Sequence, residues 1–311
     1  MTISPHHTTR SVATPPIEPD GAARALSRRN MLKTTALLAG LGGLLVAIGS
    51  LLGGTTGTLI GLVLGLGLVG GGYWNSDRLA VRAARARPVA DGELVWLQED
   101  LAILATRAGL PTPRLFLSPD AQPNAFATGR NERHAVVCVT AGLLEHLDRD
   151  EVRGVVAHEI AHIRHRDILI GSVAAAVATG ISAIANLALF AGMFGGDDED
   201  RPNPIAALLL AMLAPIAATV LQMALSRSRE YEADRLGAQL LGDPLPLASA
   251  LLTIEAMARR RPMDVDPAHA TAFIVNPLTG RQMRFAQLFL THPPTTERVA
   301  RLHSLRGEVA R

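Results

Sequence analysis

The 311-residue sequence contains one cysteine, one lysine and only 4% aromatic residues. The single cysteine, Cys138, excludes a disulfide framework within the chain and a cysteine-based zinc site. The formal net charge is only +2, and the sequence has no lysine- and arginine-rich run of the kind that binds nucleic acid. Cys138 lies within the apolar run 135–139, where we expect a buried strand.

Charged residues are also scarce, at 19%, whereas hydrophobic residues make up 48% of the chain. A disordered chain needs the opposite balance, with low hydrophobicity and high charge. The 28 glycines and the low aromatic content are typical of closely packed membrane helices, although a GC-rich genome gives a similar bias. The composition therefore favours a membrane protein without establishing one.

Four apolar runs are close to or longer than the ~20 residues that a helix needs to cross a bilayer. Residues 34–52 and 58–74 are joined by a short uncharged link, and they predict a helical hairpin through the membrane within residues 30–75. Residues 168–194 and 204–225 are separated by an acidic loop and predict a second hairpin. A cleavable signal peptide would explain the first run alone, and no Ala-x-Ala cleavage site stands between the first two runs.

Arginine and lysine gather before the first run and after the second, whereas the loop between the third and fourth runs is acidic. Because positive residues stay on the cytoplasmic side, we expect both termini and both charged segments to be cytoplasmic. The predicted organisation is a disordered arm at 1–29, a membrane hairpin at 30–75, a charged segment at 76–167, a second hairpin at 168–225 and a final charged segment at 226–311.

The charged segments have the patterns of a mainly α fold with a small sheet. Helical periodicity covers residues 91–109, and a long helix is expected from about Arg149. Residues 226–311 are mostly helical in pattern. Short strands are predicted at 113–118, 125–128 and 135–140, and a short helix at 143–147.

The most informative motif is the pentad His-Glu-Ile-Ala-His at 158–162. On a helix, residues i and i+4 share a face, so that both imidazoles can bind one metal ion at ~2.0–2.1 Å. Glu159 is turned away by about 100°, where it can reach a metal-bound water as general base without ligating the metal. The pattern Asp148-x-x-Glu151 predicts a capping box at the start of this helix. A chance match is the alternative, but a capped amphipathic helix just before an apolar run favours a metal site.

A zinc hydrolase usually has three protein ligands and one open position, so a third ligand is needed. The candidate is Glu230 in the segment 226–234, directly after the fourth apolar run. Glu230 and Asp234 are one helical turn apart, so Glu230 would ligate while Asp234 would accept a hydrogen bond from a ligand imidazole. Glu232 points elsewhere and is expected to be solvated. The alternative is an ordinary pair of surface charges, since this spacing is common.

These motifs resemble those of the HtpX-type integral-membrane zinc metallopeptidases, with the CAAX prenyl proteases as more distant relatives. The resemblance covers residues 30–305 and includes Pro-Asn-Ala-Phe-Ala at 123–127, Ser-Arg-x-x-Glu-Tyr-x-Ala-Asp at 226–234 and Thr-His-Pro-Pro-Thr-Thr-Glu-Arg at 291–298. It implies a zincin-like (gluzincin) catalytic domain with four transmembrane helices in the inner membrane of a bacterium. It also implies endoproteolysis of membrane or misfolded proteins in envelope quality control under stress.

The resemblance also implies the roles of individual residues. One Zn²⁺ per chain would be held by His158, His162 and Glu230, and Glu159 would be the catalytic base. Asp234 would support one of the ligand imidazoles. The N-terminal arm is longer than the family pattern leads us to expect.

Two further features bear on substrate binding. Residues Asn124, Ala125, Phe126 and Ala127 are expected to form an edge strand beside the metal helix, which would bind an extended peptide through main-chain hydrogen bonds. An internal strand is the alternative. By the same resemblance His292 would donate a hydrogen bond to the oxyanion of the reacting carbonyl, although a lone histidine before two prolines also fits an ordinary loop.

The sequence therefore predicts a membrane-embedded zinc endopeptidase that contacts the lipid bilayer and protein or peptide substrates, and no nucleic acid. Glu159 would take a proton from the zinc-activated water and pass it to the leaving amine. The alternative is a catalytically silent membrane holdase or scaffold with a structural zinc, but such a site does not need Glu159. A transporter is disfavoured, because the apolar runs hold no acidic or basic residue along an ion path.

Overall fold

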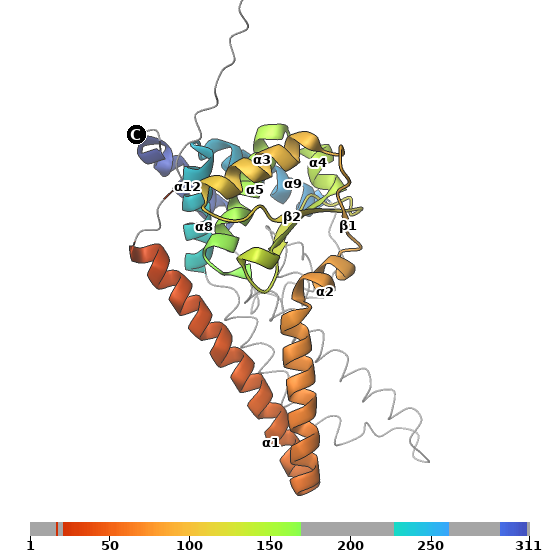
Figure 1. The fold of residues 1–311 in the computed structure, drawn as a ribbon. Helices are drawn as coiled ribbons and strands as arrows, with labels where there is room; N and C mark the ends of the chain where they lie inside the picture. The colour runs from red at the N-terminus through yellow and green to blue at the C-terminus, as the bar shows by residue number, and fades with distance from the viewer. Residues whose placement is uncertain (1–16, 18–20, 169–226, 261–292, 310–311) are drawn as a thin grey trace, which may run out of the picture.

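The computed structural model describes residues 17, 21–168, 227–260 and 293–309, which are mainly helical with a small mixed sheet (Figure 1). A long helix, α1 (Gly21–Trp74), extends away from a body that the other elements form. The elements of the body are, in chain order, α2 (Ser76–Ala83), β1 (Arg87–Pro88), α3 (Val95–Arg107), β2 (Arg114–Ser118), β3 (Ala125–Thr128), β4 (Val136–Thr140), α4 (Ala141–His146), α5 (Arg149–Arg164), α8 (Arg227–Leu241), α9 (Leu245–Arg260) and α12 (Thr295–Val309).

Helix α1 contains both of the first two predicted apolar runs. Figure 1 shows it as two straight arms that meet at an acute angle. Gly54, within the predicted link, has a φ of +55°, and a right-handed helix cannot run straight through a positive φ. The two runs therefore lie in α1 on either side of Gly54.

The start of α1 differs from the prediction. Residues 21–29, which we expected to belong to a disordered arm at 1–29, are helical. Alanines at 22, 23 and 25 favour a helix, and the helix continues from them into the apolar run. Ile17 donates its backbone N–H to the carbonyl of Arg107 at 2.8 Å, so this part of the arm contacts the body.

The four predicted membrane spans are not confirmed by the structure. No helix among the described residues is both long enough and apolar enough to cross a bilayer. The second predicted hairpin, from residue 169 onward, lies outside the described residues.

The sheet has the strand order β1-β2-β4-β3. Strands β2 and β4 are parallel, and β1 and β3 pair antiparallel with them at the two edges. The three predicted strands are confirmed to within one residue at each end, and Cys138 is buried in β4 as predicted. Strand β1 was not predicted, because two residues are too few to show an alternating pattern.

The helices predicted at 91–109 and 143–147 are confirmed with shifted ends. Helix α3 is shorter than the predicted 91–109, because Gly92 and Leu94 have φ values of +82° and +47° that a helix does not accept. Helix α4 begins two residues before the predicted 143–147, where the Thr140 hydroxyl accepts a hydrogen bond from the Leu143 N–H at 3.1 Å.

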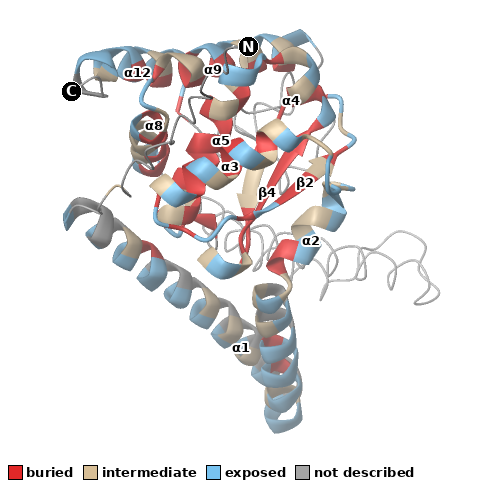
Figure 2. Cartoon of the chain, turned by 45° about the horizontal axis from the view of Figure 1, so that its top comes forward, coloured by how far each residue is buried: buried red, intermediate tan, exposed pale blue. Residues whose placement is uncertain are grey.

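Helix α5 runs through the centre of the body and is buried over most of its length (Figure 2). Its predicted start and cap are confirmed, since Asp148 accepts from the Glu151 N–H at 2.8 Å and Glu151 accepts from the Asp148 N–H at 3.1 Å. Helices α3, α8 and α9 and strand β3 all pack against it. Side chains near its C-terminal end are therefore held by several elements at once.

Candidate metal centre

The pentad lies in the last two turns of α5, where its polar side chains are buried. His158 and Glu159 are 1% and 5% exposed. His162, one turn later, has a side chain that is 15% exposed. Helix α8 crosses this part of α5 closely, and a Cβ on Gly237 would lie 3.1 Å from the backbone nitrogen of His158. This approach brings Glu230, two turns before Gly237 on α8, over the two imidazoles.

Three side chains converge on one point. The Nε2 atoms of His158 and His162 lie 3.1 Å apart, and each lies 3.6 Å from a carboxylate oxygen of Glu230. Bonds of ~2.0–2.1 Å at tetrahedral angles place zinc ligands about 3.3–3.4 Å from one another. The three residues therefore fit one tetrahedral metal ion, and no rearrangement of the helices is needed.

The buried ion pair of Asp234 and Arg298 lies on the side of His158 that faces away from Glu230. The Nδ1 of His158 donates to Asp234 at 3.0 Å, the contact that the sequence predicted for Asp234. Arg298, at the start of α12 and 1% exposed, donates to both oxygens of Asp234, from Nη2 at 2.6 Å and from Nε at 2.8 Å. The Arg298 charge outweighs burial and lowers the pKa of Asp234 to about 2. An ionised Asp234 fixes the proton on Nδ1 and leaves the Nε2 lone pair for a metal.

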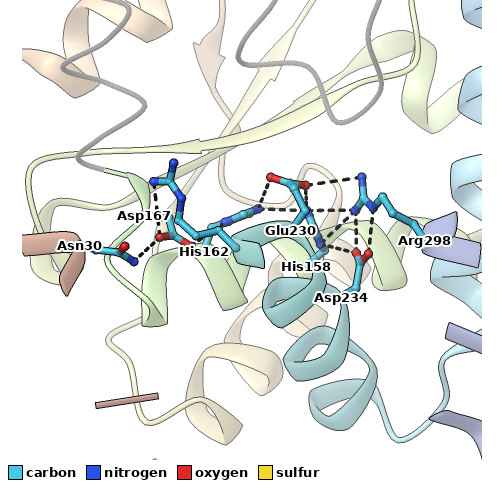
Figure 3. Close-up of polar contacts among 8 residues, drawn as sticks. Asn30, His158, His162, Asp167, Glu230, Asp234 and Arg298 are labelled. Atoms are coloured by element: carbon cyan, nitrogen blue, oxygen red, sulfur yellow. Dashed lines mark hydrogen bonds and ion pairs between the residues drawn. The ribbon is translucent and has the colours of Figure 1, made fainter. Parts of the chain in front are cut away.

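A second carboxylate holds His162 in the same way. The Nδ1 of His162 donates to Asp167 at 3.1 Å, and Asp167 lies just beyond the end of α5. The other oxygen of Asp167 accepts from the side-chain amide of Asn30 at 2.5 Å. Asn30 belongs to α1, so the N-terminal helix reaches the metal centre (Figure 3).

The two imidazoles, whose Nε2 atoms lie 3.1 Å apart, have pKa shifts of opposite sign. Burial lowers the pKa of His158 to about 4, which keeps this imidazole neutral. Burial also lowers the pKa of His162, but the hydrogen bond to Asp167 and the charge of Glu230 outweigh it and raise the value to about 9. The site thus favours positive charge between the imidazoles, which a divalent cation supplies.

The charge balance of the site supports the same conclusion. Among the described residues, four carboxylates lie at the site, and two buried guanidinium groups lie beside them. The carboxylates outnumber the guanidinium groups, so the site favours a bound cation. The carboxylates are Glu159, Asp167, Glu230 and Asp234, and the guanidinium groups are those of Arg229, 3.9 Å from Asp167, and Arg298.

Glu159 is not one of the three converging residues, but it lies beside them. The backbone N–H of Ala127 in β3 donates to its carboxylate. Burial raises the pKa of Glu159 to about 7, against the opposing charge of His162. A carboxylate in this range exchanges a proton readily near neutral pH.

The remaining predicted residues have different outcomes. Within the part of the chain that the structure describes, residues 125–128 form an edge strand rather than an internal one, and β3 packs on α5. Asn124 precedes β3 and is tied to β4, because its N–H donates to the Thr140 hydroxyl at 2.9 Å. Glu232 is half-exposed and pairs with Arg235 at 2.8 Å, in keeping with a solvated side chain. His292 lies outside the described residues.

Sequence reasoning missed three residues of this site. Arg298 was visible only as the last residue of the segment 291–298, and its burial has no sequence signal. Asp167 was expected to end the helix, and Asn30 was not singled out. The sequence offered a weak signal for two of these residues. Asn30 is a polar residue just before an apolar run, and Asp167 is a carboxylate five residues after His162.

The comparisons with known proteins agree with this geometry. Residues 93–306 match the pattern of peptidase family M48. A protein described as "Protease HtpX homolog" from Pelotomaculum thermopropionicum is 48% identical over 280 residues, which cover 89% of this chain and 99% of that protein. The protein of the same description from Gemmatimonas aurantiaca is 47% identical over 279 residues, which cover 89% and 99% of the two chains.

The chain is also similar to solved structures. The crystal structure of S. mikatae Ste24p is 20% identical in sequence and superposes with a TM-score of 0.47, over 90% of this chain and 67% of that one.

Arg298 is predicted to be the main electrostatic support of the site. The variant Arg298→Gln leaves Asp234 and Glu230 buried without their guanidinium, and we expect it to lower the free energy of unfolding by about 3–5 kcal/mol. Chemical denaturation of the purified protein measures this loss. Arg306→Gln, on the exposed face of the same helix, is the matched control and should change the stability by less than about 0.5 kcal/mol. Equal effects of the two substitutions would contradict a supporting role for Arg298.

Proposed function

Because the chain belongs to peptidase family M48, and is therefore a metalloprotease that acts on proteins or peptides, we propose that it is a zinc endopeptidase of the bacterial inner membrane. The observation that carries the proposal is the convergence of His158, His162 and Glu230 on one point, with Glu159 next to them. Zinc is the metal we assign, because two imidazoles and one carboxylate with an open fourth position are the ligands of zinc hydrolases.

Each residue of the site has a part in the proposed reaction. A bound zinc ion supplies a Lewis acid that polarises the scissile carbonyl and lowers the pKa of water. Glu159 takes the proton from the attacking water and gives it to the leaving amine. Asp234 and Asp167 hold the proton on the Nδ1 atoms of the two ligand imidazoles, so that both Nε2 atoms remain available.

The position of β3 at an edge of the described sheet supports a substrate site along Asn124, Ala125, Phe126 and Ala127. The carbonyl of Asn124 accepts from the Thr140 N–H on β4, so in an antiparallel pair the main-chain groups of Ala125 and Ala127 point to the free edge. The Ala127 N–H is taken by Glu159. We propose that an extended peptide pairs with the remaining groups of this edge, directly beside the base. For His292 we keep the role of oxyanion donor as a proposal.

The proposed membrane location rests on the four apolar runs and on the surface of α1. Its arms expose a series of large apolar side chains to the surroundings, which fits a lipid environment. These include Met31, Leu32, Leu59, Ile60, Leu62, Val63, Leu64, Leu66 and Trp74. We propose spans at 34–52, 58–74, 168–194 and 204–225, with the charged segments 76–167 and 226–311 on the cytoplasmic side.

Two contacts support a cytoplasmic N-terminus. Ile17 bonds to Arg107 of the body, and Asn30 bonds to Asp167 at the metal centre. The residues before the first apolar run and the catalytic body therefore lie on the same side of the proposed bilayer. Two segments on the same side of a bilayer must be joined by an even number of spans. The two spans proposed within α1, and the two proposed between α5 and α8, meet this requirement.

The alternative function is a membrane holdase or scaffold with a structural zinc. A purely structural site has four protein ligands and no need of a buried carboxylate beside them. The position of Glu159 favours the enzyme. For the substrates we propose membrane or misfolded proteins, as part of envelope quality control under stress.

Replacing the base is predicted to separate catalysis from metal binding. Glu159→Gln keeps the size of the side chain and the three ligands, so that zinc content should remain at one per chain. Cleavage of casein by the detergent-purified protein should fall at least about 100-fold, because a general base contributes this much or more. Glu232→Gln, on the exposed side of α8, should cleave at the rate of the unsubstituted protein.

Zinc in both proteins with an unchanged rate for Glu159→Gln would show that another group is the base. Absence of zinc from the unsubstituted protein would contradict the proposed metal. Purification with a chelator and later addition of zinc keeps the unsubstituted protein inactive until the assay.

The proposed topology predicts where reporters will be active. Alkaline phosphatase fused after Asp198, in the acidic loop between the third and fourth runs, should be active, because this loop is expected outside the cytoplasm. The same enzyme fused after Arg311 should be inactive, and a fluorescent protein at that position should fold. An inactive phosphatase at Asp198 together with a fluorescent fusion there would exclude full crossing by the second hairpin.

A further inference from the structure

Asn30 makes a contact that the proposed reaction does not use. Its side chain is 1% exposed, although its neighbours on α1, Met31 and Leu32, are 57% and 71% exposed. The Asn30 amide nitrogen donates twice, to the carbonyl of His165 at 3.1 Å and to the carboxylate of Asp167 at 2.5 Å. One side chain of α1 is thus tied to the loop that follows the metal helix.

Asp167 links this contact to the metal centre. One of its oxygens accepts from Asn30, and the other accepts from the Nδ1 of His162 at 3.1 Å. Figure 3 shows the three side chains in a row, with Asn30 at one end and the Nε2 of His162 pointing to Glu230 at the other. The orientation of the imidazole therefore depends on the orientation of Asp167, which Asn30 helps to fix.

The two imidazoles differ in the rigidity of their supports. Asp234 on α8 forms a bidentate ion pair with Arg298, and both residues belong to the body. Asp167 lies in a loop, and the guanidinium group of Arg229 lies 3.9 Å from its carboxylate. The short bond from Asn30 is the closest contact that holds its other oxygen. Hydrogen-bond partners of metal-ligating histidines typically change metal affinity by about 10–100-fold.

From these contacts we infer that Asn30 is a positioning residue for the metal ligand His162, and that α1 is part of the metal-binding apparatus as well as an anchor. The inference rests on the proposed zinc site. It means that a displacement of the first arm of α1 reaches the metal through Asp167.

The test is the rate at which the full-length protein loses zinc to an excess of chelator. All variants carry Glu159→Gln, which prevents self-cleavage and leaves the ligands intact. Asn30→Ala should release zinc at least about 10-fold faster than this parent protein. Asn30→Asp should be at least as fast, because its carboxylate faces that of Asp167. Thr35→Ala, which removes an exposed hydroxyl bonded within α1, should release zinc at the parent rate.

A double-substitution cycle distinguishes positioning from a general loss of structure. If Asn30 acts through Asp167, then Asn30→Ala should add less than about two-fold to the rate of the Asp167→Ala protein, because coupled residues are not additive. Full additivity, or release from Asn30→Ala at the parent rate, would overturn the inference. A parent protein that binds no zinc would instead refute the proposed function.

Discussion

The structure depends on one arrangement: two buried imidazoles whose Nε2 atoms lie 3.1 Å apart. Such a pair is stable only with a proton or a cation between the nitrogens, and its geometry must be imposed from outside. Each imidazole is fixed by a carboxylate on its far nitrogen, Asp234 for His158 and Asp167 for His162. Asn30 of α1 donates a hydrogen bond to Asp167, and Arg298 of α12 donates two to Asp234. The polar contacts thus form a single row across the site, from Asn30 to Arg298.

This row explains why the body is built around α5. Buried charges are costly unless they are paired, so every charged group at the site needs a partner from another element. Helix α8 supplies Glu230 and Asp234, α12 supplies Arg298, and β3 supplies the Ala127 N–H that bonds to Glu159. The site is complete only when α1 and α12 are both in place. The proposed metal ligands, the proposed base and the proposed substrate strand thus all pack against or belong to α5.

Local patterns in the sequence predicted the parts of the fold that local physics determines. Short runs of apolar and β-forming residues indicated β2, β3 and β4, the capping box indicated the start of α5, and the spacing of two histidines identified the pentad. Glu230 was found because a ligand was missing and a helix followed the last apolar run. The contacts of Asn30 and Arg298 could not be predicted, because they join residues 137 and 64 positions apart and have no periodic signal. The helix at 21–29 was missed because polar residues among its alanines suggested disorder.

The central claim is that His158, His162 and Glu230 together hold zinc. The most direct measurement is zinc K-edge X-ray absorption on the purified Glu159→Gln protein. The predicted spectrum contains two imidazoles and oxygen or nitrogen neighbours at ~2.0–2.1 Å. The outer-shell imidazole signal should fall by half in His162→Ala. A sulfur neighbour at ~2.3 Å, or a spectrum with no imidazole signal, would contradict the account.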